Sequence, residues 1–191
     1  MLQARTANRA MVTAPHHLAA EAGLAVLRDG GNAVEATIAA AATIAVVYPH
    51  MNAIGGDGFW LIHQPNTEPI AVDACGGAGQ KVDNALYAGL DAIPPRGPLA
   101  ANTVAGTISG WQTALDTAAG WGTPLPLARL LEDAIHYAKY GFPMTGNQHA
   151  MTVSKLDELR DVSGFDETLL IDGQPAPQRT NYTNQRLART L

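Results

Sequence analysis

Apolar residues recur along the chain with helical spacing in some segments and as short blocks in others. Residues 18–29 are predicted to form a helix because apolar side chains line one face. Residues 33–47 are small or apolar on nearly every side, which is typical of a buried helix. Between them, Gly30 and Gly31 predict a glycine-terminated helix end. Asn32, with Glu35 three positions later, predicts a capping box for the second helix.

Two short apolar blocks, residues 58–63 and 70–73, are predicted to be strands, the first of them buried. The segment between them is rich in turn-forming residues, so we expect a hairpin. Residues 163–179 are predicted to be a loop. Further helices are expected at 111–119, 127–140, 147–159 and 184–191.

The most unusual local sequence is Gly55-Gly56-Asp57-Gly58, directly before the first predicted strand. Three glycines in four positions predict a tight turn or a close approach by another group. A phosphate-binding loop would need a following Lys-Ser/Thr pair or a following helix, and this segment has neither, so a nucleotide site is the weaker interpretation. A purely structural turn and a turn beside a ligand both stay open.

Composition narrows the class of protein. The 191 residues are 47% hydrophobic and 15% charged, which indicates one globular domain rather than a disordered chain. A net charge of −5 argues against nucleic acid as a partner. No signal sequence is visible, and the longest apolar run, residues 36–48, is too short to span a bilayer. These features predict a soluble, cytoplasmic protein without a membrane partner.

The histidines do not predict a metal site. His16 and His17 are adjacent, and His50 has no carboxylate at helical spacing, so loop or capping roles are favoured. The single cysteine, Cys75, excludes an internal disulfide and a thiolate cluster. We therefore predict neither a metal nor a cofactor.

Two residues at the end of the second predicted strand and just beyond it, Asp73 and Cys75, are candidates for a binding site. Cys75 precedes two glycines at a strand end, a place where pockets are often lined, but no histidine base is visible nearby. It is interpreted as a pocket residue, with a buried structural cysteine as the alternative. Asp73 is favoured as an acceptor for loop N–H groups, with a ligand contact as its alternative. No complete catalytic set is visible.

Several segments together resemble the amino-terminal part of γ-glutamyltranspeptidases, and their order along the chain makes the resemblance specific. They are Met11–His16, Glu21–Leu24, Gly30–Ala36, Val47–Phe59, Thr103–Thr107, Glu132–Ile135, Gly141–Pro143 and Asn181–Leu191.

The resemblance implies an α/β fold, part of the four-layer αββα sandwich of amino-terminal-nucleophile hydrolases. Members of this family cut themselves into a large and a small subunit, and the new amino-terminal threonine is the nucleophile. Residues 1–191 would then be the first part of a large subunit, a single incomplete domain with no catalytic residue of its own. The small subunit would be its partner. We expect the chain to fold poorly alone, because an apolar sheet face would lack its cover.

One departure from the family pattern bears on the substrate. Typical transpeptidases carry Asp-Phe/Tyr-Arg-Glu after the second strand, and that arginine grips the α-carboxylate of the glutamyl group. Here Cys75 replaces the arginine and Gly76 replaces the glutamate. We therefore predict an amidohydrolase for a small, oxamate-like amide, with Asp73, Cys75 and Gly76 at the substrate site. A γ-glutamyl transferase and a non-catalytic binding or structural protein are the alternatives.

Overall fold

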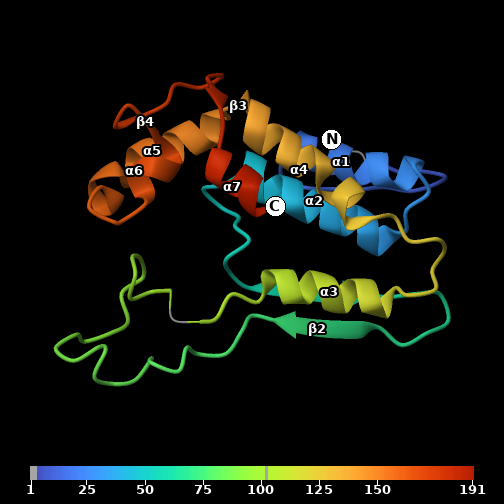
Figure 1. The fold of residues 1–191 in the computed structure, drawn as a ribbon, viewed down its shortest axis with the longest axis horizontal. Coiled ribbons are helices and arrows are strands. Elements are labelled where there is room, and N and C mark those ends of the chain that lie inside the picture. Colours follow the sequence, from blue (N-terminus) through green and yellow to red (C-terminus); the bar gives the residue numbers. More distant parts are fainter. Residues whose placement is uncertain (1–3, 102) are drawn as a thin grey trace. The chain divides into compact units, whose positions relative to one another are not determined.

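The computed structural model describes residues 4–101 and 103–191 (Figure 1). The chain divides into two compact units. The first comprises the residues up to Asn52 together with Ala114–Phe142 and Asn181–Leu191. The second comprises Ala53–Thr113 and Pro143–Thr180. That residues 1–191 form one incomplete domain stays a prediction.

The first unit is built from helices. Its elements are α1 (His17–Arg28), α2 (Ala33–Val47), α4 (Leu127–Tyr140), α7 (Gln185–Thr190) and the last residues of α3 (Thr107–Thr117). Helix α2 contacts both α1 and α4, and α7 contacts α4. The predictions for α1, α2, α4 and α7 are confirmed to within one residue at each end. Helix α3 begins four residues before its predicted start at 111.

The turn between α1 and α2 follows its predicted chemistry. Gly30 has a φ of +96°, and the N–H of Gly31 donates to the Val26 carbonyl at 2.9 Å, which closes α1 in a Schellman motif. Asn32 Oδ1 accepts from the N–H groups of Val34 and Glu35, and Glu35 Oε2 accepts from the Asn32 N–H at 2.8 Å. The capping box is therefore confirmed.

Small residues allow α1 and α2 to pack closely. A Cβ at Gly23 of α1 would lie 2.7 Å from the carbonyl oxygen of Ala36 in α2, so only glycine fits there. Most of α2 is buried, as predicted for a helix without a polar face. The core of this unit includes Ala19, Ala22, Val26, Ile38, Ala39, Ala42, Leu130, Ala134 and Ala138.

The second unit contains the predicted hairpin. Strands β1 (Gly58–Ile62) and β2 (Ile70–Ala74) pair antiparallel, with Gly58 opposite Ala74 and Trp60 opposite Val72. The start of α3 lies against one face of this hairpin. A Cβ at Gly110 would lie 2.6 Å from the Ala74 side chain and 3.4 Å from Trp60 Nε1, so the helix and the hairpin approach as closely as glycine allows.

The other face of the hairpin differs from its prediction. Strand β1 was expected to be buried, but Phe59 is 71% exposed and Leu61 is 78% exposed. Both side chains lie on the face opposite to Trp60, because successive residues of a strand point to opposite sides. Among the described residues, α3 therefore covers the Trp60 face of the hairpin and leaves Phe59 and Leu61 exposed.

Residues 163–179 are not the loop that we predicted. They contain α6 (Phe165–Leu169) and a hairpin of β4 (Leu170–Ile171) and β5 (Gln174–Pro175). The connection is Asp172-Gly173, with φ values of +52° and +72°. An Asp-Gly pair is a strong sequence signal for a tight hairpin turn, and the sequence interpretation passed over it.

The remaining elements are α5 (Gly146–Leu159) and the paired strands β3 (Phe142–Pro143) and β6 (Asn181–Tyr182). Helix α5 begins one residue before its prediction, with Thr145 Oγ1 accepting from the Gln148 N–H at 3.1 Å. In the part of the chain that the structure describes, no helix has the length and apolar character needed to cross a membrane.

Candidate functional site

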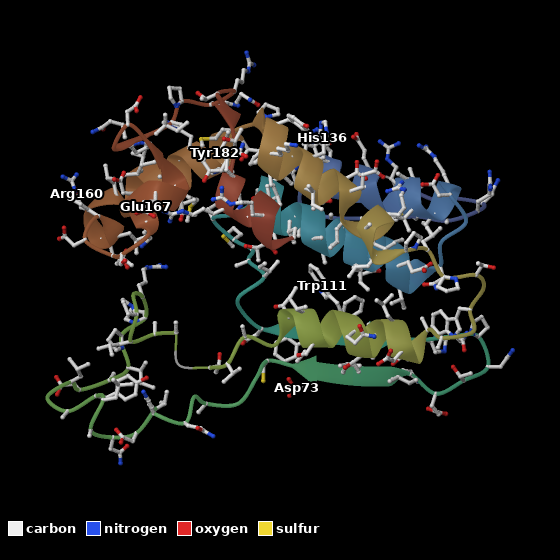
Figure 2. The ribbon with its side chains drawn as sticks, in the orientation of Figure 1. Asp73, Trp111, His136, Arg160, Glu167 and Tyr182 are labelled. Carbon is white, nitrogen blue, oxygen red and sulfur yellow. The ribbon has the colours of Figure 1, made fainter. Side chains whose placement is uncertain are left out.

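The hairpin brings the two segments singled out in the sequence to the same end of one small sheet. Gly58, which ends the glycine turn, is paired with Ala74, and Phe59 is paired with Asp73. Asp57 and Cys75 are the next residues beyond this end of the ladder. Figure 2 shows Asp73 on the side of β2 that faces away from α3. The glycine turn and the segment Asp73–Gly76 are therefore neighbours.

Asp73 serves as an acceptor within its own loop. Its Oδ1 accepts a hydrogen bond from the backbone N–H of Cys75 at 3.0 Å, which confirms the local role predicted for it. Hydrogen bonding from the side chain and the backbone N–H of Cys75 lowers the pKa of Asp73. The carboxylate is exposed and ionised at neutral pH. Its contact with a substrate stays a prediction.

Cys75 is held as a neutral thiol. The hydrogen bond with Asp73, with smaller contributions from desolvation and from the charges of Asp73 and Asp57, raises the pKa of Cys75. The thiol lies 3.6 Å from the Gly76 carbonyl oxygen, to which it donates. A nucleophilic cysteine needs a lowered pKa, so this environment argues against a nucleophile and agrees with the prediction.

Gly76 occupies a position that only glycine can fill. Its φ is +76°, and a Cβ there would overlap the Val104 carbonyl oxygen and lie 2.9 Å from the carbonyl carbon. The Val104 N–H donates to the Gly77 carbonyl at 2.9 Å. A second close approach follows at Gly106, where a Cβ would lie 2.8 Å from the Ala74 carbonyl carbon. The loop after β2 thus runs against the backbone that leads into α3.

The first two glycines of the glycine turn are not in close contact with the described chain. A Cβ at Gly55 or Gly56 would meet no atom of the described chain within 4 Å, and neither residue has a positive φ. The turn is held instead through the Gly56 carbonyl, which accepts from the N–H of Thr107 at 3.2 Å and from its hydroxyl group. The close backbone approaches in this unit lie at Gly76 and Gly106, and a ligand beside the glycine turn stays a prediction.

Gly106 and Thr107 lie next to the site, although no sequence pattern predicted them there. Both belong to the segment Thr103–Thr107, which contributed to the family resemblance but was not interpreted as a neighbour of Cys75. Asp57 was likewise treated only as part of the turn. The available signal was the pair Gly106-Thr107 at the start of a helix, and it has meaning only once the hairpin register is known.

The structure favours the capping role for His16. Its Nδ1 accepts from the Leu18 N–H at 3.2 Å at the start of α1, and its ring stacks on that of His17 at 4.7 Å between centroids. Burial, followed by the nearby charge of His17, lowers the pKa of His16. Among the described residues, no three histidine, cysteine or carboxylate side chains gather in a way that could hold a metal ion.

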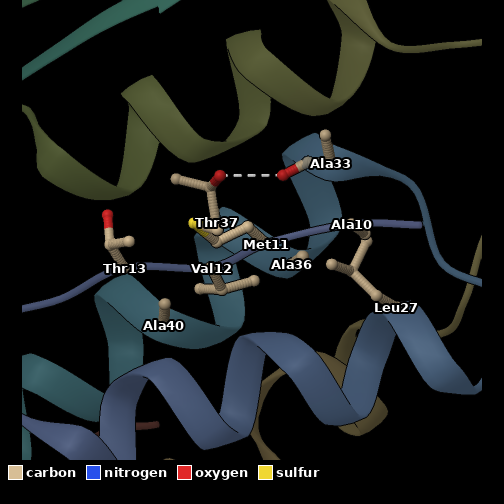
Figure 3. Close-up of a pocket in the computed structure, with 9 residues that line it drawn as sticks. All are labelled: Ala10, Met11, Val12, Thr13, Leu27, Ala33, Ala36, Thr37 and Ala40. Carbon is tan, nitrogen blue, oxygen red and sulfur yellow. Dashed lines mark hydrogen bonds between the residues drawn. The ribbon is translucent and has the colours of Figure 1, made fainter. Parts of the chain in front are cut away.

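A hollow of about 450 Å³ lies in the first unit, between the segment before α1 and the faces of α1 and α2 (Figure 3). Its lining contains no ionisable side chain: Ala10, Met11, Val12, Thr13, Leu27, Ala33, Ala36, Thr37 and Ala40. The Thr37 hydroxyl group donates to the Ala33 carbonyl at 2.7 Å within α2. This hollow offers an apolar surface but no group for acid–base chemistry.

Comparisons with known proteins agree with one another. The family model of gamma-glutamyltranspeptidase matches residues 19–191. An oxamate amidohydrolase proenzyme of Klebsiella pneumoniae is 52% identical over all of this chain and 36% of its own length. A glutathione hydrolase-like YwrD proenzyme of Bacillus subtilis is 41% identical over 95% of this chain and 34% of its own length. The chain thus spans about a third of the curated relatives that it matches.

Solved structures give the same result. The gamma-glutamyltranspeptidase of Helicobacter pylori superposes with a TM-score of 0.87 at 26% identity, over 98% of this chain and 54% of that one. The gamma-glutamyltranspeptidase of Pseudomonas nitroreducens, in complex with L-DON, superposes with a TM-score of 0.82 at 27% identity. The match covers 97% of this chain and 54% of that one. The predicted α/β class is confirmed. The chain belongs to the gamma-glutamyltranspeptidase family and has the fold of the corresponding part of these amino-terminal-nucleophile hydrolases.

Proposed function

We propose that the complete protein is an amidohydrolase that cleaves a small, oxamate-like amide. The reaction would pass through an acyl-enzyme on a threonine downstream of Leu191, exposed when the precursor cuts itself. Support comes from family membership and from the names of the relatives, which include an oxamate amidohydrolase and are described as proenzymes. The nucleophile, most donors to the developing oxyanion and the second subunit would lie outside these residues.

The observation that carries this proposal is the replacement of a cation by a neutral thiol between two carboxylates. At the position where the family pattern has arginine, Cys75 lies beside Asp73 and within the field of Asp57. A bidentate guanidinium is well matched to a carboxylate, whereas this arrangement repels one. The α-carboxylate of a γ-glutamyl donor would find no binding partner at this position.

The chemistry of the two substrate classes fits this difference. In a γ-glutamyl amide, a chain of carbon atoms separates the α-carboxylate from the reacting carbonyl. In oxamate, the carboxylate is bonded to the reacting carbonyl itself, so it would lie close to the nucleophile and away from the position of Cys75. The absence of a cation at residue 75 therefore weakens binding of a glutamyl donor more than binding of oxamate.

Within this proposal, Asp73, Cys75 and Gly76 form part of the substrate site, and the small subunit made by self-cleavage completes it. The cytoplasmic location and the two-subunit form belong to the same proposal. Cell fractionation and mass spectrometry of the purified protein would test them. A single uncut chain without a new amino-terminal threonine would contradict the mechanism.

The discriminating experiment is an assay of the full-length protein with two substrates. Release of ammonia from oxamate should be efficient, whereas release of p-nitroaniline from γ-glutamyl-p-nitroanilide should be slow. The second candidate function is γ-glutamyl transfer or hydrolysis, favoured by the relatives that are called glutathione hydrolases. Rapid turnover of the anilide, with transfer to dipeptides, would establish that alternative. If the full-length protein turned over neither substrate, the non-catalytic binding or structural role would be favoured.

A further inference from the structure

The loop after β2 is fixed by a backbone crossing at Gly76. The Gly76 α-carbon lies so close to the Val104 carbonyl that no Cβ can be accommodated, and its φ of +76° belongs to the region that favours glycine. The Val104 N–H donates to Gly77 at 2.9 Å, and Ala78 forms an isolated bridge with Thr103. The crossing is therefore held by several backbone contacts.

The neighbouring glycine provides a contrast. A Cβ at Gly77 would meet no described atom within 4 Å, and its φ is not positive. The side chain of Val104 is 60% exposed, so the crossing depends on its backbone and not on its side chain. Of these adjacent glycines, only Gly76 has a structural reason to lack a side chain.

The crossing controls the residue on which substrate choice depends. The backbone N–H of Cys75 donates a hydrogen bond to Asp73 Oδ1, and the thiol of Cys75 donates to the carbonyl oxygen of Gly76. The position of the thiol is therefore determined by the backbone on both sides. If the Gly76 peptide moved away from Val104, the Cys75 side chain would turn with it.

We propose that Gly76 is a positioning residue for substrate specificity. Through its crossing with Val104, it holds Cys75 where the family pattern has arginine, and it leaves no room for the glutamate that follows that arginine. Specificity thus depends on the backbone path as well as on the side chain at position 75. An arginine at position 75 is compatible with this loop, but the arginine–glutamate pair is not. This inference rests on the proposed function.

The test uses the full-length, processed protein carrying Cys75→Arg, and it compares Gly76→Ala and Gly76→Asn with Gly77→Ala and Val104→Ala in that background. Asparagine tolerates a positive φ but still carries a Cβ, so it separates the φ requirement from the crossing. We expect KM for γ-glutamyl-p-nitroanilide to rise about tenfold or more in both Gly76 variants, with kcat changed much less, because a displaced guanidinium holds the α-carboxylate less well. Both control variants should stay within about twofold of the protein that carries Cys75→Arg alone.

Two outcomes of these assays would overturn the proposal. One is an unchanged KM in Gly76→Ala. The other is a KM in Gly76→Asn equal to that of the protein with Cys75→Arg alone, which would show that φ alone matters. A wild-type protein that hydrolyses neither amide would overturn the proposed function instead.

Hydrogen exchange tests the crossing without relying on activity or on the folding of a variant. In the wild-type protein, the Val104 amide should exchange much more slowly than in an unstructured peptide, and addition of oxamate should not slow it further. That result would support a loop that is fixed before substrate binds, even if Gly76→Ala does not fold. Exchange at the unprotected rate, or protection that appears only with oxamate, would contradict the proposal.

Discussion

The carboxylate of Glu35 connects the start of α2 with the chain that leads into α4. Its Oε1 accepts from the Leu125 N–H at 2.7 Å, and its Oε2 accepts from the Asn32 N–H at 2.8 Å. The residue is 1% exposed. A residue predicted only as a local helix cap therefore also fixes a segment ninety positions away.

Replacement of Glu35 by alanine should destabilise the protein strongly. The substitution leaves two part-buried N–H groups without their acceptor, and each such loss costs about 1–3 kcal/mol. We expect Glu35→Gln to cost less than Glu35→Ala, because one amide oxygen can still accept. Denaturant unfolding of the full-length protein would measure both effects.

Asp157→Asn is the matched control for this comparison. The Asp157 side chain is 99% exposed and its ion pair with Arg160 spans 3.5 Å. An exposed pair of this kind contributes about 1 kcal/mol or less. Equal unfolding free energies for Glu35→Ala and the wild type would show that the contact with Leu125 does not contribute to stability.

Tyr182 should make the first unit sensitive to alkaline pH. Burial raises the pKa of Tyr182 to about 12, and its ring packs edge-on against Phe142. Because the unfolded chain ionises near pH 10, the stability from this residue is full below that pH and is lost as pH rises towards 12. Between pH 9 and pH 11, the unfolding free energy should fall by about 1.3 kcal/mol from this residue alone.

Tyr182→Phe should remove that component of the pH dependence, because phenylalanine cannot ionise. Tyr140→Phe is the control, since Tyr140 is 60% exposed. Unfolding curves at pH 9 and pH 11 would separate the two variants. Identical pH dependence in the wild type and in Tyr182→Phe would show that Tyr182 ionises equally in both states.

The sequence predicted the helices of the first unit well because their signals are local. The Gly30-Gly31 pair, the Asn32–Glu35 box and the apolar surface of residues 33–47 all report on neighbouring residues. The link from Glu35 to Leu125 depends on where α4 begins in space, which no local pattern specifies. Capping could be predicted, but the second role of the carboxylate could not.

The candidate site shows the same limit. Asp73 and Cys75 were found from their place at a strand end, and Cys75 and Gly76 also because the sequence departs from the family pattern there. A tight turn or a close approach was predicted for the run Gly55–Gly58, whereas the closest backbone approaches of this unit are at Gly76 and Gly106. A run of glycines shows that the backbone is free, but it does not show which atom approaches it. Only the hairpin register and the crossing with Val104 supply that information.

The thiol of Cys75 should be slow to react with alkylating reagents at neutral pH. Its pKa is raised by Asp73, and only the thiolate attacks such reagents. In Asp73→Asn an acceptor oxygen is retained while the charge is removed, so alkylation at a fixed pH should become faster. Peptide mapping by mass spectrometry would follow Cys75 specifically in the full-length protein.

Glu68→Gln is the control for that experiment, because Glu68 is an exposed carboxylate in the turn before β2, at the other end of the strand. In the Glu68→Gln variant, Cys75 should be alkylated at the wild-type rate. A rate that does not change in Asp73→Asn would mean that the charge of Asp73 does not hold the thiol in its neutral form.

Cys75→Arg should give the protein affinity for γ-glutamyl donors. The substitution restores the cation of the family pattern at a position that is not fully buried and has no positive φ. A charge-assisted hydrogen bond contributes about 1.5–3 kcal/mol, so KM for γ-glutamyl-p-nitroanilide should fall by roughly tenfold to a hundredfold. Activity on oxamate should change much less, because its carboxylate would lie beside the reacting carbonyl.

Cys75→Gln is the control, since glutamine is long but uncharged and should leave KM for the anilide near the wild-type value. If glutamine and arginine had equal effects, side-chain length rather than charge would determine which donor binds, and the electrostatic basis of the proposed substrate preference would be wrong.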